Sequence, residues 1–167
     1  GEAAVRAAGA LLDYLYTTQK TDLSHLTAFQ YYTSGQYMEL DLTARRNLEL
    51  TETMRAKEKK GSLLWVLDKT KTAMGGRLIR SWMERPLLSP VPINKRLEAV
   101  ADLTGSAIAR DEIAACLREV TDLERLISRV VYGTAGARDL VALAGGLGRL
   151  PRLRELLEGC PCLLYTS

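Results

Sequence analysis

The sequence is poor in the residues from which catalytic and metal sites are usually built. Only three of its 167 residues are cysteine and one is histidine. Cys116 stands alone and Cys160 and Cys162 crowd the C-terminus, so neither a disulfide framework nor a four-ligand zinc site can be built. His25 has no second histidine with which to form a metal cluster or a catalytic pair. The composition therefore predicts a chain for a reducing compartment with no chemistry of its own.

An excess of one charge and a long apolar run are also lacking. Lysine and arginine number 23 against 20 aspartate and glutamate residues, which leaves a net charge of only +3. That value is too small to indicate nucleic acid by itself. The sequence contains no run of roughly 18 uncharged apolar residues, so no membrane partner is expected. We expect one soluble, cytoplasmic globular domain.

Apolar residues recur at helical spacing over most of the chain. The first such pattern predicts a helix over about residues 2–19. Gly61, Pro86 and the stretch 133–136 break the later patterns, as expected at helix ends. Four residues with side chains suited to capping precede later helical segments, namely Asp41, Ser62, Thr72 and Thr121. The sequence therefore predicts a mainly α fold with irregular, short helices.

One stretch near the N-terminus departs from the helical pattern. Residues 28–32 and residues 36–40 are two short β-prone runs, and Ser34 and Gly35 lie between them. Glycine supplies the positive φ that a tight turn requires. We therefore expect one small β-hairpin here.

No motif in the sequence indicates catalysis or cofactor binding. The glycines at 75–76 and at 145–148 lack the spacing and the Lys-Ser/Thr ending of a phosphate-binding loop. Two pairs of carboxylates, Glu49 with Glu52 and Glu119 with Asp122, have the spacing of solvated helix faces. We therefore assign no catalytic, cofactor-binding or metal-binding residue.

Residues 61–87 predict a rigid corner between two helices. Asp68, Thr70 and Thr72 can satisfy the unpaired amides of the bend. Gly75 lies just inside the second helix, where a small residue permits close approach of another backbone. Arg77 follows it and supplies a planar fork for carboxylates or carbonyls.

A basic stretch, residues 57–71, overlaps this corner. Lys57, Lys59 and Lys60 could contact phosphates without reading bases. Glu58 and Asp68 interrupt the stretch, which also fits a solvated basic loop. A stand-alone helical module that binds DNA or docks on a protein through residues 57–71 is therefore one functional hypothesis.

A second hypothesis rests on four motifs in collinear order. These are residues 45–50 (R-R-N-L-E-L), 62–77 (S-L-L-x-V-L-D-x-T-x-T-x-M-G-x-R), 122–125 (D-L-E-R) and 137–140 (A-R-D-L). As a set they resemble the core, or lever, domain of MutS, the DNA mismatch-recognition ATPase of bacteria. The resemblance implies that residues 1–20 lead out of a connector region and that residues 21–158 form the N-terminal part of the core. Residues 159–167 depart from the family pattern.

The resemblance implies a structural and allosteric role within a longer parent protein. In that family the core couples the ATPase to the clamp that grips DNA. Expected partners are the remaining domains of the parent, mismatched duplex DNA bound through the parent, and a second copy in a homodimer. The family's mismatch-reading Phe-x-Glu motif, its Walker A loop and its clamp are missing from the sequence. ATP and Mg²⁺ are therefore expected to bind elsewhere in the parent. We expect this segment neither to read mismatches nor to hydrolyse ATP, and so not to be an enzyme by itself.

Particular residues follow from the matched motifs. We expect Arg45, Arg46 and Asp68 to make polar contacts within the chain, and Gly133 and Gly136 to act as hinges. The full set with expected structural or coupling roles is Arg45, Arg46, Asn47, Asp68, Thr70, Thr72, Gly75, Arg77, Gly133 and Gly136.

Overall fold

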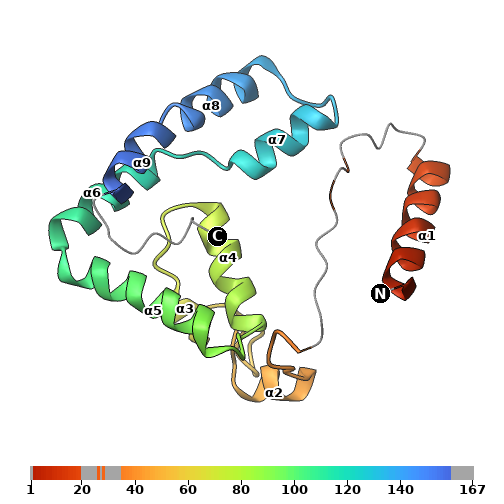
Figure 1. Cartoon of the computed structure of the whole chain (residues 1–167), viewed down its shortest axis with the longest axis horizontal. Helices are drawn as coiled ribbons and strands as arrows, with labels where there is room; N and C mark the ends of the chain where they lie inside the picture. The colour runs from red at the N-terminus through yellow and green to blue at the C-terminus, as the bar shows by residue number, and fades with distance from the viewer. Residues whose placement is uncertain (1, 20–25, 27, 29–34, 159–167) are drawn as a thin grey trace. The chain divides into compact units, whose positions relative to one another are not determined.

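The computed structural model describes residues 2–19, 26, 28 and 35–158. Within these residues the regular secondary structure is entirely α-helical, so the prediction of a mainly α chain is confirmed (Figure 1). The helices are α1 (Glu2–Gln19), α2 (Leu42–Asn47), α3 (Leu63–Leu67), α4 (Ala73–Glu84), α5 (Pro90–Gly105), α6 (Ala107–Arg118), α7 (Leu123–Val131), α8 (Ala137–Leu147) and α9 (Leu150–Glu158). Helix α1 belongs to one compact unit, Gly1–Tyr32, and the other helices belong to a second, Thr33–Ser167.

Three of the predicted caps begin helices in the second unit. The Asp41 carboxylate accepts a hydrogen bond from the Ala44 amide at 2.6 Å and begins α2. The Ser62 hydroxyl accepts from Trp65 N at 3.3 Å, and Thr72 Oγ1 accepts from Gly75 N at 3.0 Å. Thr121 was expected to cap α7, but Asp122 takes that place, with its carboxylate accepting from the Arg125 amide.

The predicted β-hairpin is not seen. Most of its first arm lies outside the described residues, and its second arm forms no strand. Tyr37 in the second arm instead makes an isolated antiparallel bridge to Leu87, just after α4. The Met38 amide donates to the Pro86 carbonyl at 2.8 Å. Residues 36–38 therefore pair with the extended chain that follows α4, whose backbone groups need partners because Pro86 helps end the helix.

The helices of the second unit pack mainly in neighbouring pairs. Helix α3 contacts α4, α5 contacts α6, α6 contacts α9, and α7 contacts α8, which lies beside it (Figure 1). None of the helices in the described part of the chain combines the length and apolarity needed to cross a membrane.

The apolar core of the described residues is small. Five apolar side chains are buried, those of Leu50, Leu64, Ala99, Ile113 and Val120. Many large apolar side chains are exposed instead, including Val91, Ile108, Tyr132 and Val141. Exposed apolar surface on this scale is typical of a contact surface for another domain or protein.

Candidate functional site

The bend between α3 and α4 is held by a cluster that we call the Asp68 corner: Lys59, Asp68, Thr70 and Thr72. Lys59 Nζ donates to Asp68 Oδ2 at 2.6 Å, and Thr70 Oγ1 donates to Asp68 Oδ1 at 2.6 Å. The Lys59 ammonium and the Thr70 hydroxyl lower the pKa of the Asp68 carboxyl to about 2. Asp68 is therefore ionised at neutral pH and fixes the bend, as predicted for this residue.

The small residues at the start of α4 accommodate the chain's own bend. A Cβ added at Gly75 would lie 3.1 Å from Thr72 Oγ1 and 3.3 Å from Thr70 Cβ. These distances are tighter than most van der Waals contacts, so Gly75 lets the Thr-x-Thr segment pack on the helix. The expected close approach is present, and the approaching segment is residues 70–72.

Arg77 joins this corner to a distant helix in what we call the Arg77 junction: Arg77, Asp122 and Glu124. The guanidinium donates from Nη1 to Asp122 Oδ2 at 3.0 Å and from Nη2 to Asp122 Oδ1 at 2.6 Å. Its Nε and Nη2 also donate to Glu124 Oε2, at 2.9 Å and 2.7 Å. This two-pronged geometry matches the planar fork of arginine to a carboxylate and sets orientation as well as distance. The junction thereby ties the N-terminal half of α4 to the start of α7.

The charges of the Arg77 junction reinforce each other. The hydrogen bonds to Asp122 and then to Glu124 raise the pKa of Arg77, and those from Arg77 lower the pKa of Asp122. Asp122 also caps α7, so one carboxylate both begins the helix and receives the arginine. Sequence reasoning interpreted Asp122 as part of a solvated face and missed Glu124. The signal available for Asp122 was its place directly before an apolar helical pattern.

The arginines of the R-R-N-L-E-L motif behave differently from each other. Arg45 Nε donates to the Leu40 carbonyl at 3.0 Å, which confirms a polar contact within the chain. Arg46 is exposed, and the described residues provide no hydrogen bond or ion pair for its side chain, so its contact stays a prediction. Asn47 is the last residue of α2 and Glu49, two residues later, has a positive φ of 45°. The Glu49 carboxylate accepts from Met54 N at 2.6 Å, so it organises the following loop and is more than a solvated acid.

The link between α7 and α8 contains the two predicted hinge glycines. Gly133 has a φ of +68°, a conformation that other residues rarely adopt. Gly136 caps α8, and its amide donates to Asp139 Oδ2 at 2.8 Å. Arg129 Nη1 donates to the other oxygen of Asp139 at 2.9 Å. The link is therefore bridged by an ion pair between the helices that it joins.

The predicted phosphate contacts differ in their availability. Lys59 is paired with Asp68, and Lys57 Nζ lies 4.0 Å from Glu52 Oε1. Lys60 is exposed, and the described residues place no carboxylate within ion-pair distance of it. Across the same part of the chain, no group of three or more metal-ligating side chains gathers. The site therefore consists of hydrogen bonds and ion pairs that connect the helices.

Comparison with known proteins agrees with the motifs. The family model for MutS domain III matches residues 43–165, a range that includes most of residues 159–167. The chain is 51% identical over 163 residues to the DNA mismatch repair protein MutS of Lachnoclostridium phytofermentans, covering 98% of this chain and 18% of that protein. It is 53% identical over 156 residues to the same-named protein of Ruminiclostridium cellulolyticum, again covering 18% of it. Residues 159–167 lie outside the described residues. Their departure from the family pattern stays a prediction.

The chain thus spans about a fifth of the length of these curated relatives, and the family model covers most of the chain. A match of this extent, with half of the residues identical, is decisive for the family. The chain belongs to the MutS domain III family.

Proposed function

We propose that this chain is the N-terminal part of the core, or lever, domain of a longer cytoplasmic mismatch-repair ATPase. Its role there is to couple nucleotide state to the grip on DNA. Family membership and the 18% coverage of the relatives support this proposal. The observation that carries it is the Arg77 junction, in which Arg77 of α4 binds Asp122, a residue 45 positions later at the start of α7.

The coupling works through fixed joints. The Asp68 corner fixes the angle between α3 and α4, and the Arg77 junction fixes the N-terminal half of α4 to the start of α7. A displacement applied to α3 and α4 is therefore passed to α7 and, through its packing, to α8. Such a contiguous chain of contacts is the physical route by which one site biases another.

The parent supplies what this chain lacks. ATP and Mg²⁺ bind in the parent's ATPase, mismatched duplex DNA is held by other domains, and the parent works as a homodimer. Because binding free energies are reciprocal, DNA changes the affinity for nucleotide by the same factor as nucleotide changes the affinity for DNA. The present chain is the element between these sites and catalyses no reaction itself.

The test uses the full-length protein that carries this segment. Arg77→Gln removes the fork to Asp122 and Glu124, while Arg80→Gln removes only a pair with Glu84 within α4. We expect the first variant to change the rate of ATP-dependent release from mismatched DNA by roughly threefold or more. The second should leave that rate unchanged. Equal release rates for Arg77→Gln and the unaltered protein would exclude the junction from coupling.

A separate variant tests the hinge. Gly136 has no neighbour closer than 3.9 Å to an added Cβ, so Gly136→Ala stiffens the link without a clash. We expect altered kinetics of ATP-dependent clamp release in the full-length protein. Gly105→Ala, at the end of α5 with open space around it, is the matched control. Unchanged kinetics in Gly136→Ala would remove the hinge assignment.

A DNA-binding module formed by residues 57–71 is the second candidate. The observation in its favour is the set of lysines without carboxylate partners in the described residues, Lys60, Lys69 and Lys71. Such a module retards duplex DNA by itself, with a steep dependence on salt. The coupling core predicts little retardation by the 167-residue chain, so one gel experiment over a salt series separates the two.

A further inference from the structure

Helix α3 buries one side chain and exposes the rest. Leu64 is 2% exposed, whereas four other apolar side chains remain about half exposed. We call these four the α3 face: Leu63 (44%), Trp65 (48%), Val66 (53%) and Leu67 (49%). Leu63, Val66 and Leu67 are spaced three and four apart, so they form one stripe. Trp65 lies on the neighbouring side of α3, about 100° round the helix from Val66.

The residues around this face carry an excess of positive charge. Residues 52–71 contain six lysine or arginine residues and three acidic ones, a net charge of +3. The whole chain also has a net charge of +3, so 17 basic and 17 acidic residues balance elsewhere. The segment that contains α3 is therefore positively charged, as is the following segment, residues 72–96, which holds five basic residues and one acidic residue.

Three exposed lysines flank α3 in sequence, Lys60 before it and Lys69 and Lys71 after it. Lys59 is held by Asp68 at 2.6 Å, and this pair ties the residues before α3 to those after it. Lys60, Lys69 and Lys71 are exposed and have no carboxylate within ion-pair distance among the described residues. Since α3 has five residues, it is only about 7.5 Å long, so lysines beyond both ends can reach a partner lying on the face.

We propose that the α3 face, with Lys60, Lys69 and Lys71 as its rim, docks an acidic amphipathic helix of another protein chain. The partner lays leucine-like side chains on the stripe and directs carboxylates to the lysines. An apolar centre with a charged rim is the usual anatomy of a protein interface, and the rim charges speed the encounter. The inference rests on this surface alone and not on the coupling role.

Other occupants fit the surface less well. Interfaces with DNA are polar and rich in phosphate contacts, and a stripe of leucine and valine side chains has no hydrogen-bond donor or positive charge for a phosphate. A second copy brings the same +3 region and repels. One face of a five-residue helix is also smaller than the roughly 800 Å² per partner of a standard interface, so the docking is weak and reversible.

Trp65 is itself the reporter for the experiment. The chain has two tryptophans, and Arg96 lies 3.5 Å over the ring of Trp82. Trp82→Phe keeps an aromatic surface under Arg96 and leaves Trp65 as the single tryptophan. The 167-residue chain with this change is titrated with three designed helical peptides of equal length. One has a leucine stripe flanked by glutamates, one has the same stripe flanked by lysines, and one has the glutamates with serine in place of leucine. Duplex DNA is the fourth titrant.

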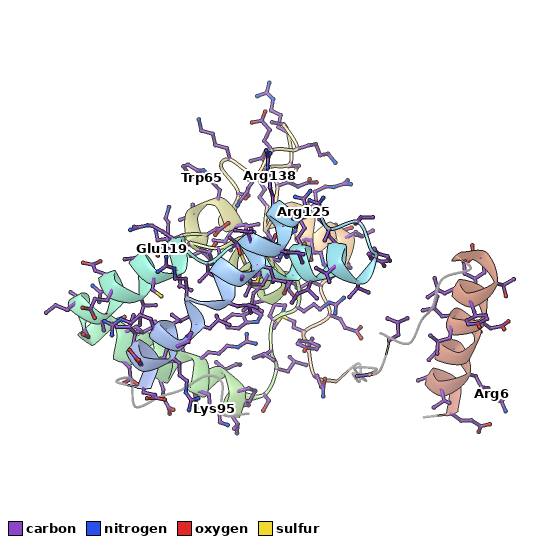
Figure 2. The ribbon with its side chains drawn as sticks, turned by 90° about the horizontal axis from the view of Figure 1, so that it is seen from above. Arg6, Trp65, Lys95, Glu119, Arg125 and Arg138 are labelled. Carbon is purple, nitrogen blue, oxygen red and sulfur yellow. The ribbon has the colours of Figure 1, made fainter. Side chains whose placement is uncertain are left out.

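We expect the acidic leucine peptide to shift Trp65 emission to shorter wavelength and to bind at least tenfold more tightly than the other titrants. Lys60→Glu combined with Lys69→Glu should weaken this binding roughly tenfold. Lys95→Glu combined with Arg138→Glu makes the same charge change on α5 and α8 and should not affect it (Figure 2). Val66→Ser should weaken binding while retaining the circular dichroism spectrum.

Three results would overturn the proposal. Equal binding of the basic peptide would show that charge does not select the partner. Tighter binding of duplex DNA would assign the surface to nucleic acid. Absence of any Trp65 shift with the acidic leucine peptide, in a chain whose helical spectrum is intact, would show that the surface docks no such helix.

Discussion

Two adjacent glycines of α8 should respond in opposite ways to the same substitution. Gly146 is buried, and a Cβ added there would overlap Thr121 Oγ1 and lie 2.8 Å from Leu123 Cδ2. Gly145 has nothing within 4 Å of an added Cβ. Both lie in the same helix, so the helix propensity gained from alanine is the same at each. The difference between the two variants therefore isolates the packing of α8 on the start of α7.

The magnitude follows from opposing contributions. Alanine in place of glycine in a helix interior contributes about 1 kcal/mol of stability. Overpacking at Gly146 costs about 1–3 kcal/mol. The Thr121 hydroxyl, which donates to the Ala142 carbonyl at 3.1 Å, is displaced at a further cost of about 1 kcal/mol. We expect Gly145→Ala to raise the free energy of unfolding by about 1 kcal/mol and Gly146→Ala to lower it by about 2 kcal/mol.

The assay is urea denaturation of the 167-residue chain followed by circular dichroism, with amide hydrogen exchange to locate the change in α8. Thr121→Ala removes the overlapping oxygen, so it should partly restore the stability of Gly146→Ala, and the two changes should not be additive. A Gly146→Ala variant as stable as Gly145→Ala would refute the close approach of α8 to Thr121.

Two further predictions concern polar groups near α3. The pKa of Asp68, about 2 in the folded chain, lies below its ordinary value of 3.8, so its stabilising effect is complete above about pH 4 and is lost as the pH falls toward 2. Asp68→Asn should abolish that part of the acid destabilisation, which amounts to about 1 kcal/mol because Lys59 is half exposed. Urea denaturation midpoints measured at about pH 4 and about pH 2 test this. Ser62 is fully buried and its hydroxyl donates to the Lys59 carbonyl at 2.7 Å while capping α3. Ser62→Ala should therefore cost about 2 kcal/mol, and Ser106→Ala at the exposed cap of α6 less than 1 kcal/mol, by the same assay; equal costs would contradict the role of burial.

The elements that the sequence predicted well are those fixed by neighbours in the chain. A capping side chain accepts a hydrogen bond from an amide three residues later, so Asp41, Ser62 and Thr72 predict the starts of their helices from local sequence alone. The Asp68 corner is likewise local, because its partners lie within nine residues. The spacing of apolar residues along one helix can be read from a single sequence, and so can a capping side chain close to the amide that it binds.

The contacts that the sequence did not predict join residues far apart. Arg77 was recognised as a fork, but nothing local indicates that its acceptors stand 45 and 47 residues later. The second β-prone run was paired with its neighbour across a glycine, whereas Tyr37 bridges to Leu87 fifty residues away. The sequence indicated only that Gly146 lowers helix stability, whereas in the structure the absence of a side chain at Gly146 leaves room for Thr121. Such pairings depend on the packing of whole helices.

The balance of these interactions bears on how the chain responds to its neighbours. The described part buries few apolar side chains, so hydrophobic burial alone holds its helices together weakly. The joints between helices are instead ion pairs that are partly open to solvent, such as those of Arg77 and of Arg129 with Asp139. Exposed pairs contribute little stability each, yet their geometry is directional. An arrangement that is specified by direction but held by small energies can be shifted by a bound domain at low cost, which is the property that the proposed coupling role requires.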